Sequence, residues 1–312
     1  MTNTPIGFIG FGEVGHSLSK GLRSEGSLAV LAYDIDLKKP DRKHRVVARA
    51  DDAGVGLCET IAELTEQCGM IFSAVVSSAS IAVARSTAPH LNPAHVYIDL
   101  NSTSPQVKQE VGRIVEETGA RFVEAAIMAA VPSFGHRVPI LLCGAAAAET
   151  IGLLAPFGMS LENFGREIGR ASATKMFRSI VVKGLEALLL ECALAAERYG
   201  VTERVLASVG AGYPGIDWNK LAHFLLGRTA IHGDRRAHEM LEVAETLRAL
   251  NIQPLMSDAA AERLLDAARL GLKSRFEDKP PESYHDVVHA IQELQASTVL
   301  SQSSPTRISH RE

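Results

Sequence analysis

Short apolar runs alternate with helical patterns over the first half of the chain. The runs that predict strands lie at 6–9, 28–33, 55–58, 70–76, 96–100, 121–126 and 138–143. Between the first two runs, Leu18 and Leu22 lie four residues apart, which places them on one helical face. Ser104 and Pro105 are typical of the start of a helix after the fifth run. Strands that alternate with helices predict a parallel sheet with helices on both faces.

The pattern changes after Gly169, where helical periodicity replaces the short apolar runs. Helices are predicted at 171–199, 202–210, 218–231, 233–250 and 257–272, and a loop at 278–283 precedes one last helix. We therefore expect an α/β domain at 1–168 and an all-α domain for substrate binding and oligomerisation at 169–300, joined by the long helix. The polar segment 301–312 is expected to be a disordered tail.

The charge and composition of the chain are ordinary for a globular protein. The net charge is −4, and 46% of the residues are hydrophobic and 22% charged. A weakly negative chain without a basic run argues against nucleic acid or an anionic membrane as its partner. The most apolar long segment, 180–196, contains Lys183, Glu186 and Glu191, so it predicts a core helix and not a membrane span.

The ends and the cysteines favour a cytoplasmic protein. Residues 1–5 carry no basic region, so no signal peptide is predicted. Cys58, Cys143 and Cys192 lie in apolar runs and are expected to be buried thiols in a reducing compartment. No metal site is predicted.

The first strand runs into a glycine-rich loop that is typical of dinucleotide binding. The loop consists of Gly10, Phe11, Gly12, Glu13, Val14 and Gly15. In the Gly-x-Gly-x-x-Gly pattern the first glycine permits a tight turn, the second lets the backbone approach a pyrophosphate, and the third lets the helix pack on the sheet. The positive end of the following helix attracts phosphates. Together with its flanking strand and helix, the loop predicts a Rossmann domain; a glycine-rich turn without a ligand is the alternative.

Asp34 ends the second predicted strand, 22 residues after Gly12. A carboxylate there accepts hydrogen bonds from the adenosine ribose and repels a 2′-phosphate, so NAD is the expected cofactor. An exposed turn acid is the alternative. Lys38, Lys39 and Arg42 follow closely, and they leave NADP possible.

The start of the long helix carries a candidate proton carrier. Lys175 and Ser179 lie four residues apart and share a helical face. A lysine near the start of an apolar helix at a domain junction can be partly desolvated, which lowers the pKa of a lysine and suits it to proton transfer. The pattern alone is more typical of an exposed helix lysine.

The chain resembles the β-hydroxyacid dehydrogenase superfamily, which includes 6-phosphogluconate and 3-hydroxyisobutyrate dehydrogenases, over roughly residues 5–275. Its second half resembles a branch with its own helical C-terminal domain through the segments 175–179 and 232–236. The catalytic motif of the superfamily, Gly-x-x-x-x-x-Lys-x-x-x-Asn, falls on Gly169, Lys175 and Ser179. The resemblance implies that Lys175 is the catalytic general acid and base, with Ser179 in place of the usual asparagine at the substrate. It also implies a homodimer or homotetramer.

Two further segments carry the resemblance. Asn101 and Ser102 fall on the superfamily loop that meets the nicotinamide, although both are also typical helix caps. Val75 and Val76 end the preceding strand and are expected to line the nicotinamide pocket.

The substrate loop departs from the superfamily. Met128, Ala129 and Ala130 replace the serine and two glycines that usually hold the substrate carboxylate, so the substrate should differ from the small hydroxyacids. Arg235 and Arg236 are candidates for an anionic substrate group. Ion pairing with Glu239 or Glu242 on the same helix face is the alternative.

The sequence therefore predicts an NAD(P)-dependent oxidoreductase that transfers a hydride between nicotinamide and an alcohol near a carboxylate, in a hydroxyacid or a sugar acid. Two alternatives remain. An imine reductase has a similar architecture, but such enzymes commonly carry another residue at the position of Lys175. The altered loop and Ser179 also leave a non-catalytic NAD-binding sensor or scaffold open.

Overall fold

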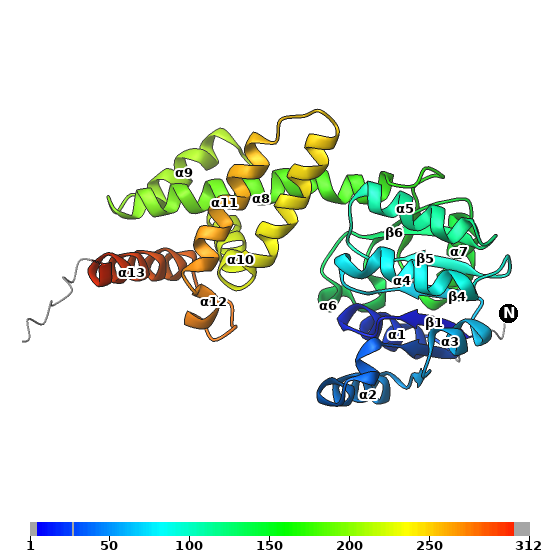
Figure 1. Cartoon of the computed structure of the whole chain (residues 1–312). Helices are drawn as coiled ribbons and strands as arrows, with labels where there is room; N and C mark the ends of the chain where they lie inside the picture. Colours follow the sequence, from blue (N-terminus) through cyan, green and yellow to red (C-terminus); the bar gives the residue numbers. More distant parts are fainter. Residues whose placement is uncertain (1–4, 27, 303–312) are drawn as a thin grey trace, which may run out of the picture. The chain divides into compact units, whose positions relative to one another are not determined.

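The structure, a computed structural model, describes residues 5–26 and 28–302 (Figure 1). The chain divides into two compact units, Met1–Met176 and Phe177–Glu312. The division falls inside the long helix α8 (Arg170–Glu197), a few residues beyond the expected boundary at 168.

The first unit is built on an eight-stranded sheet in the order β3-β2-β1-β4-β5-β6-β7-β8. Its strands are β1 (Ile6–Ile9), β2 (Val30–Tyr33), β3 (Gly56–Leu57), β4 (Met70–Ser73), β5 (Val96–Asp99), β6 (Arg121–Ile127), β7 (Ile140–Cys143) and β8 (Leu161–Asn163). The seven predicted strands are all present. β8 was not predicted, because it has only three residues and lies partly exposed at the edge of the sheet.

The expectation of a parallel sheet is wrong for one pair of strands. β7 runs antiparallel to β6, whereas the other neighbouring strands are parallel. The twelve-residue segment 128–139 that joins β6 to β7 forms only two helices, of four and three residues, and neither is long enough to cover the sheet as the helix of a parallel crossover does.

Helices cover both faces of the sheet (Figure 1). Buried side chains of α1, α2 and α7 form one apolar cluster with the sheet, and those of α3, α4 and α5 form another on the opposite face. The helices of this unit are α1 (Glu13–Ser24), α2 (Pro40–Ala53), α3 (Ile61–Gln67), α4 (Ser80–Thr87), α5 (Pro105–Glu116), α6 (Val131–Phe134) and α7 (Ala147–Leu154). Short 3-10 helices lie at Ile35–Lys38, Ser77–Ala79, Ala88–His90, Gly135–Arg137 and Ala155–Phe157. The predicted Rossmann architecture is confirmed.

The strand order has a topological switch point at β1 and β4. β1 lies between β2 and β4. The chain adds β2 and β3 on one side of β1, and after α3 it adds β4 and the later strands on the other side. In open α/β sheets ligands bind at such a switch point, outside the carboxyl ends of the strands. The glycine loop follows β1 there.

The second unit is helical. Besides the end of α8 it contains α9 (Thr202–Gly212), α10 (Trp218–Ala249), α11 (Leu255–Arg269), α12 (Leu272–Arg275) and α13 (Tyr284–Gln302). The prediction of separate helices at 218–231 and 233–250 is wrong, because α10 is continuous over 32 residues. A Cβ at Gly233 would lie 3.4 Å from the Leu264 carbonyl oxygen, so this glycine serves close packing of α10 on α11 instead of ending a helix.

Two sequence expectations concern the end of the chain and membranes. Ser301 and Gln302 belong to α13, and the rest of the predicted tail, 303–312, lies outside the described residues. Over the described ranges, no helix has both the length and the apolar character needed to span a membrane.

Candidate functional site

The glycine loop turns sharply at Gly10, directly after β1. Gly10 has a φ of +88°, and a Cβ on it would lie 2.5 Å from the Ala74 carbonyl oxygen. A Cβ on Gly15 would lie 2.7 Å from the Gly10 carbonyl oxygen. Both positions therefore require glycine for backbone reasons, as predicted.

Gly12 is different, because a Cβ there would meet no protein atom within 4 Å. It is the N-cap residue of α1 and offers no side chain to the unpaired N–H groups of the first turn. Open space in front of a helix N-terminus suits an anionic group, since the N–H groups and the helix dipole both point toward it. The loop therefore fits the pyrophosphate of a dinucleotide.

This difference between the two glycines gives a testable prediction. We expect Gly12→Ala to leave the melting temperature unchanged but to weaken NADH binding about tenfold, equivalent to about 1.4 kcal/mol, because the methyl group fills the space in front of α1. The matched variant Gly10→Ala should instead destabilise the fold by about 1–3 kcal/mol through backbone strain. Fluorescence titration with NADH and thermal denaturation measure the two effects. Equal NADH affinity in Gly12→Ala and wild type would show that no phosphate approaches this residue.

Asp34 lies beside the same loop. Its Oδ2 accepts a hydrogen bond from the Phe11 backbone N–H at 2.7 Å, and its Oδ1 accepts one from the Asp36 N–H at 2.8 Å. Each carboxylate oxygen keeps a further lone pair, so a ribose hydroxyl can still be bound. Asp34 is thus half-buried and held in place by the backbone, not a freely exposed turn acid.

The cations that follow Asp34 are largely engaged by protein carboxylates. Lys39 pairs with Asp36 at 2.7 Å, and Arg42 lies 3.6 Å from Asp41 and 4.0 Å from Asp36. Lys38 lies over the ring of Tyr33, 5.9 Å from its centre. These contacts leave a 2′-phosphate fewer available partners than the sequence suggests.

Arg49 of α2 was missed by the sequence analysis. Its guanidinium donates to the Phe11 carbonyl oxygen at 3.4 Å, so Arg49 and Asp34 contact the same residue of the glycine loop. The sequence gives no signal for this contact, because it depends on how α2 packs beside α1.

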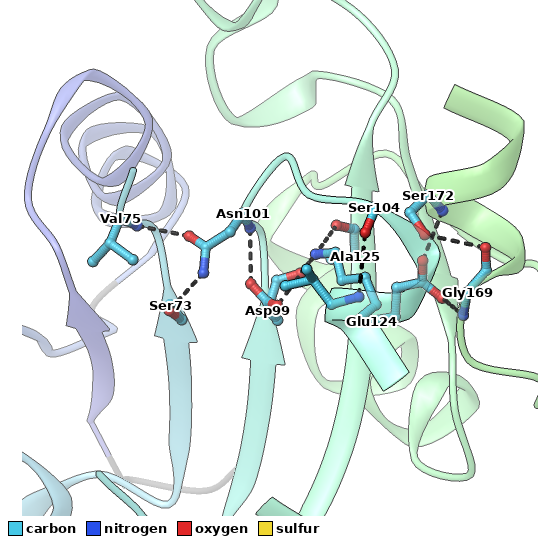
Figure 2. A network of polar contacts seen from close by, with 11 residues as sticks. Ser73, Val75, Asp99, Asn101, Ser104, Glu124, Ala125, Gly169 and Ser172 are labelled. Carbon is cyan, nitrogen blue, oxygen red and sulfur yellow. Dashed lines mark hydrogen bonds and ion pairs between the residues drawn. The ribbon is translucent and has the colours of Figure 1, made fainter. Parts of the chain in front are cut away.

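Asn101 joins the carboxyl ends of β4 and β5 (Figure 2). Its Oδ1 accepts from the Val75 N–H at 2.7 Å, its Nδ2 donates to Ser73 Oγ at 3.0 Å, and its backbone N–H donates to Asp99 Oδ1 at 2.9 Å. Because Asn101 is only 4% exposed, its side chain holds the Val75 backbone in place. A direct contact between Asn101 and the nicotinamide stays a prediction.

The neighbouring residues lie at the surface of this edge. Ser102 is exposed and Val76 is 70% exposed, which is unusual for a large apolar side chain. The alternative that Asn101 or Ser102 caps a helix is wrong, since the N-cap of α5 is Ser104, whose hydroxyl accepts from the Val107 N–H.

A buried ion pair lies beneath the ends of β5 and β6. Lys108 is 1% exposed, and its Nζ donates to the Asp99 carbonyl oxygen at 2.7 Å and lies 3.4 Å from Asp99 Oδ2. It also donates to the Ala125 carbonyl oxygen of β6 at 3.4 Å. Burial raises the pKa of Asp99, and the nearby Lys108 ammonium opposes that shift. Lys108 was not singled out from the sequence, because an α5 lysine is expected to be exposed.

The start of α8 is fixed to β6 by Glu124 (Figure 2). Its carboxylate is fully buried and accepts hydrogen bonds from the Gly169 N–H at 2.6 Å and the Ser172 N–H at 2.7 Å. Ser172 Oγ donates to the Gly169 carbonyl oxygen at 3.1 Å. Lys175 follows one turn later and is half-buried within the first unit.

The predicted substrate loop continues from the same strand. Met128 and Ala129 are half-buried and Ala130 is exposed. The Met128 N–H is already engaged by the Pro139 carbonyl oxygen at 2.8 Å. Thus β6 carries both the residue that fixes α8 and the loop predicted to meet the substrate.

In the second unit, Ser179 belongs to a chain of polar contacts. Lys183 donates to Ser179 Oγ at 3.2 Å and pairs with Glu239 of α10 at 2.5 Å. Burial lowers the pKa of Lys183, while the Glu239 carboxylate opposes the shift. Ser179 is half-buried.

The two predicted substrate arginines differ sharply. Arg235 is exposed and pairs with Glu239 at 2.6 Å, as the alternative for this helix face predicted. Arg236 is 3% exposed and bound by both carboxylate oxygens of Glu186, which also accepts from Thr229 Oγ1. The prediction that Arg236 binds substrate is not supported, because its guanidinium is occupied inside the helical core.

His285 and His289 lie four residues apart on α13, a spacing that is typical of metal ligands. The sequence analysis did not consider this pair when it predicted no metal site. Both histidines pair with Glu197, at 3.3 and 3.0 Å. Within residues 5–26 and 28–302, no group of three or more His, Cys, Asp or Glu is arranged to hold a metal ion.

Two family models match the chain. Residues 5–149 match the NAD binding domain of 6-phosphogluconate dehydrogenase, and residues 196–266 match a domain of unknown function, DUF1932. The first match contains the glycine loop, Asp34 and Asn101, and the second contains all of α10.

Two solved structures are similar over nearly their whole length. A conserved hypothetical protein from Sinorhizobium meliloti is 38% identical, with 94% of this chain and 97% of that chain covered and a TM-score of 0.78. A conserved protein described as structurally similar to 3-hydroxyacid dehydrogenases is 30% identical, with 95% and 98% covered and a TM-score of 0.68. This chain belongs to the β-hydroxyacid dehydrogenase superfamily. It has the superfamily's NAD-binding domain, together with the DUF1932 domain of one branch.

More distant members share the fold alone. A 3-hydroxyisobutyrate dehydrogenase from Mycobacterium tuberculosis is 16% identical, with 93% of this chain and 99% of that chain covered and a TM-score of 0.71. An imine reductase from Aspergillus terreus is 18% identical, with 86% and 96% covered and a TM-score of 0.56. Lys175 and Ser179 lie between the two segments that match the family models.

Proposed function

We propose that this protein is an NAD-dependent dehydrogenase that oxidises an alcohol carbon near a carboxylate, with Lys175 as general acid and base. The observation that carries the proposal is the start of α8. Glu124 holds it to β6 within the unit that contains the glycine loop, and Lys175 follows one turn later. Membership of the superfamily supports the oxidoreductase class.

The first unit supplies groups suited to each part of a dinucleotide. Gly12 and the first turn of α1 hold the pyrophosphate, and Asp34 binds the adenosine ribose. Val75 and the exposed Val76 give an apolar surface for the nicotinamide, with Ser102 beside them. Held by these residues, the nicotinamide would supply hydride acceptance and hydride donation.

Lys175 accepts or donates the proton that accompanies each hydride transfer. In oxidation its neutral Nζ takes the proton from the substrate hydroxyl as the carbonyl forms. In reduction the ammonium donates that proton to the carbonyl oxygen. In this proposal the proton transfer is assigned to Lys175 alone, and no residue is assigned to a metal ion.

NAD is the proposed cofactor. Asp34 would repel a 2′-phosphate. Lys39 and Arg42, the nearby cations, already form ion pairs with Asp36 and Asp41. An engaged cation binds a phosphate less strongly, because the existing ion pair must be broken first.

The substrate differs from 3-hydroxyisobutyrate in this proposal. Met128, Ala129 and Ala130 offer an apolar surface where the superfamily usually offers a serine hydroxyl and two glycines. Of the two candidate arginines, Arg235 is the one with an exposed side chain, so it stays the proposed partner of a substrate carboxylate or phosphate, and Ser179 is a further candidate contact. If Arg235 binds substrate, Arg235→Ala raises the Michaelis constant and leaves NADH binding unchanged.

The test of the proposal is a panel of hydroxyacids and sugar acids, assayed for reduction of NAD and of NADP. We expect at least one substrate to reduce NAD faster than NADP. Tight cofactor binding without turnover on any member would favour a sensor or scaffold. Turnover only with amines or imines would favour an imine reductase, a candidate supported by the shared fold.

A further inference from the structure

The carboxylate of Glu124 is an unusual group in the core of the first unit. It is 0% exposed, and both of its oxygens accept hydrogen bonds from backbone N–H groups. A buried charge without hydrogen bonds is strongly destabilising. Here the Gly169 and Ser172 N–H groups bind both oxygens, and the positive end of a 28-residue helix faces the charge.

The two bonds fix more than the end of a helix. Gly169 precedes α8 and has a φ of +103°, and Ser172 is the third residue of the helix. Bonds to both residues define where α8 begins and how it is rotated about its axis relative to β6. Lys175 lies three residues beyond Ser172, so it shares a helical face with that residue.

The same strand also leads to the predicted substrate loop. Glu124 and Met128 are four residues apart, on and just after β6. The strand pairs with β5 on one side and β7 on the other, which makes it a rigid element of the sheet. A side chain on β6 can therefore set the distance between the start of α8 and the loop 128–130.

We propose that Glu124 is a positioning residue for Lys175: its buried carboxylate fixes the start of α8 and so places the Lys175 ammonium relative to the loop that follows β6. This inference rests on the proposed role of Lys175. Glu124 itself touches neither substrate nor cofactor in this account. Its effect is geometric, and a misplacement of about 1 Å can lower the rate of an enzyme roughly a hundredfold.

The experiment compares Glu124→Gln, Glu124→Asp and Lys175→Met in the full chain, with a substrate found in the panel. Glutamine keeps the size of Glu124 but turns an NH₂ group toward one of the two N–H donors. Aspartate keeps both acceptor oxygens on a shorter side chain. Leu64→Ala, a change in the core cluster on the α3 side of the sheet, is the control for lost stability alone.

We expect Glu124→Gln to lower kcat by about 10- to 100-fold, with NADH affinity within twofold of wild type. Glu124→Asp should recover part of that loss. Leu64→Ala should keep the wild-type kcat well below its melting temperature. Wild-type kcat in Glu124→Gln, or an equal loss in Leu64→Ala, would overturn the inference.

A second readout does not need turnover. The rate at which an amine-reactive reagent labels Lys175, measured by peptide mass spectrometry against the exposed Lys220, reports the surroundings of Lys175 directly. We expect faster labelling of Lys175 in Glu124→Gln, because the start of α8 is loosened, and no change in Leu64→Ala. Equal labelling of Lys175 in wild type, Glu124→Gln and Leu64→Ala would contradict the inference. If Lys175→Met itself keeps its activity, the proposed function fails, whatever the result for Glu124.

Discussion

Replacing Lys175 by methionine should lower kcat by about 10³-fold while NADH binds with wild-type affinity. Methionine has a similar length, but its thioether neither accepts nor donates a proton, so the alcohol must lose its proton to water during hydride transfer. General acid and base groups contribute about 10²- to 10⁴-fold to enzyme rates. Steady-state kinetics on a panel substrate and a fluorescence titration with NADH separate the loss of chemistry from any loss of cofactor.

The control for this prediction is Arg178→Met on the same helix. Arg178 is exposed and lies three residues beyond Lys175, so its replacement tests the general effect of removing a cation from this part of α8. We expect a wild-type kcat in Arg178→Met. Turnover near wild type in Lys175→Met would remove the lysine from the mechanism.

The second large effect concerns the stability of the helical unit. Arg236→Leu should lower the free energy of unfolding by about 3–5 kcal/mol, because it leaves the fully buried carboxylate of Glu186 without its guanidinium partner. Replacing both residues with leucine should recover much of that loss, since an apolar pair of similar volume needs no compensating charge. Urea denaturation followed by helical circular dichroism measures both variants.

Arg235→Ala is the matched control on the same helix. Arg235 is exposed, and exposed ion pairs contribute only about 0–1 kcal/mol. Unfolding of this variant should stay close to wild type. A stable Arg236→Leu variant with a greatly raised Michaelis constant would contradict the structural role and restore the prediction that Arg236 binds substrate.

Local signals in the sequence were enough to predict most of the first unit. The run Ile6–Ile9, the three glycines and Asp34 lie within 30 residues, and each follows from backbone geometry or strand periodicity. The antiparallel β7 and the short β8 were not predictable in this way. Direction and pairing depend on loop length and on neighbours that become adjacent only in the folded sheet.

In the candidate site, too, residues in local motifs could be predicted, whereas contacts between residues far apart in the sequence could not. The role of Gly12 follows from its place in a motif, whereas the partners of Glu124 lie 45 and 48 residues away along the chain. Glu186 and Arg236 are 50 residues apart and meet only because α8 packs on α10. A charged residue in a helical pattern is normally expected to lie on an exposed face. The hydrophobic periodicity of the sequence therefore does not predict buried ion pairs of this kind.

Transfer of deuterium from the cofactor tests the central claim most directly. The protein would be incubated with NADH carrying deuterium at C4 of the nicotinamide and with a panel of oxo acids and imines, and the products analysed by mass spectrometry. We predict deuterium on the carbon that bears the new hydroxyl group of a hydroxyacid, and transfer that is about 10³-fold slower when Lys175 is methionine. Deuterium only in amine products, or in no product although NADH is bound, would contradict the account.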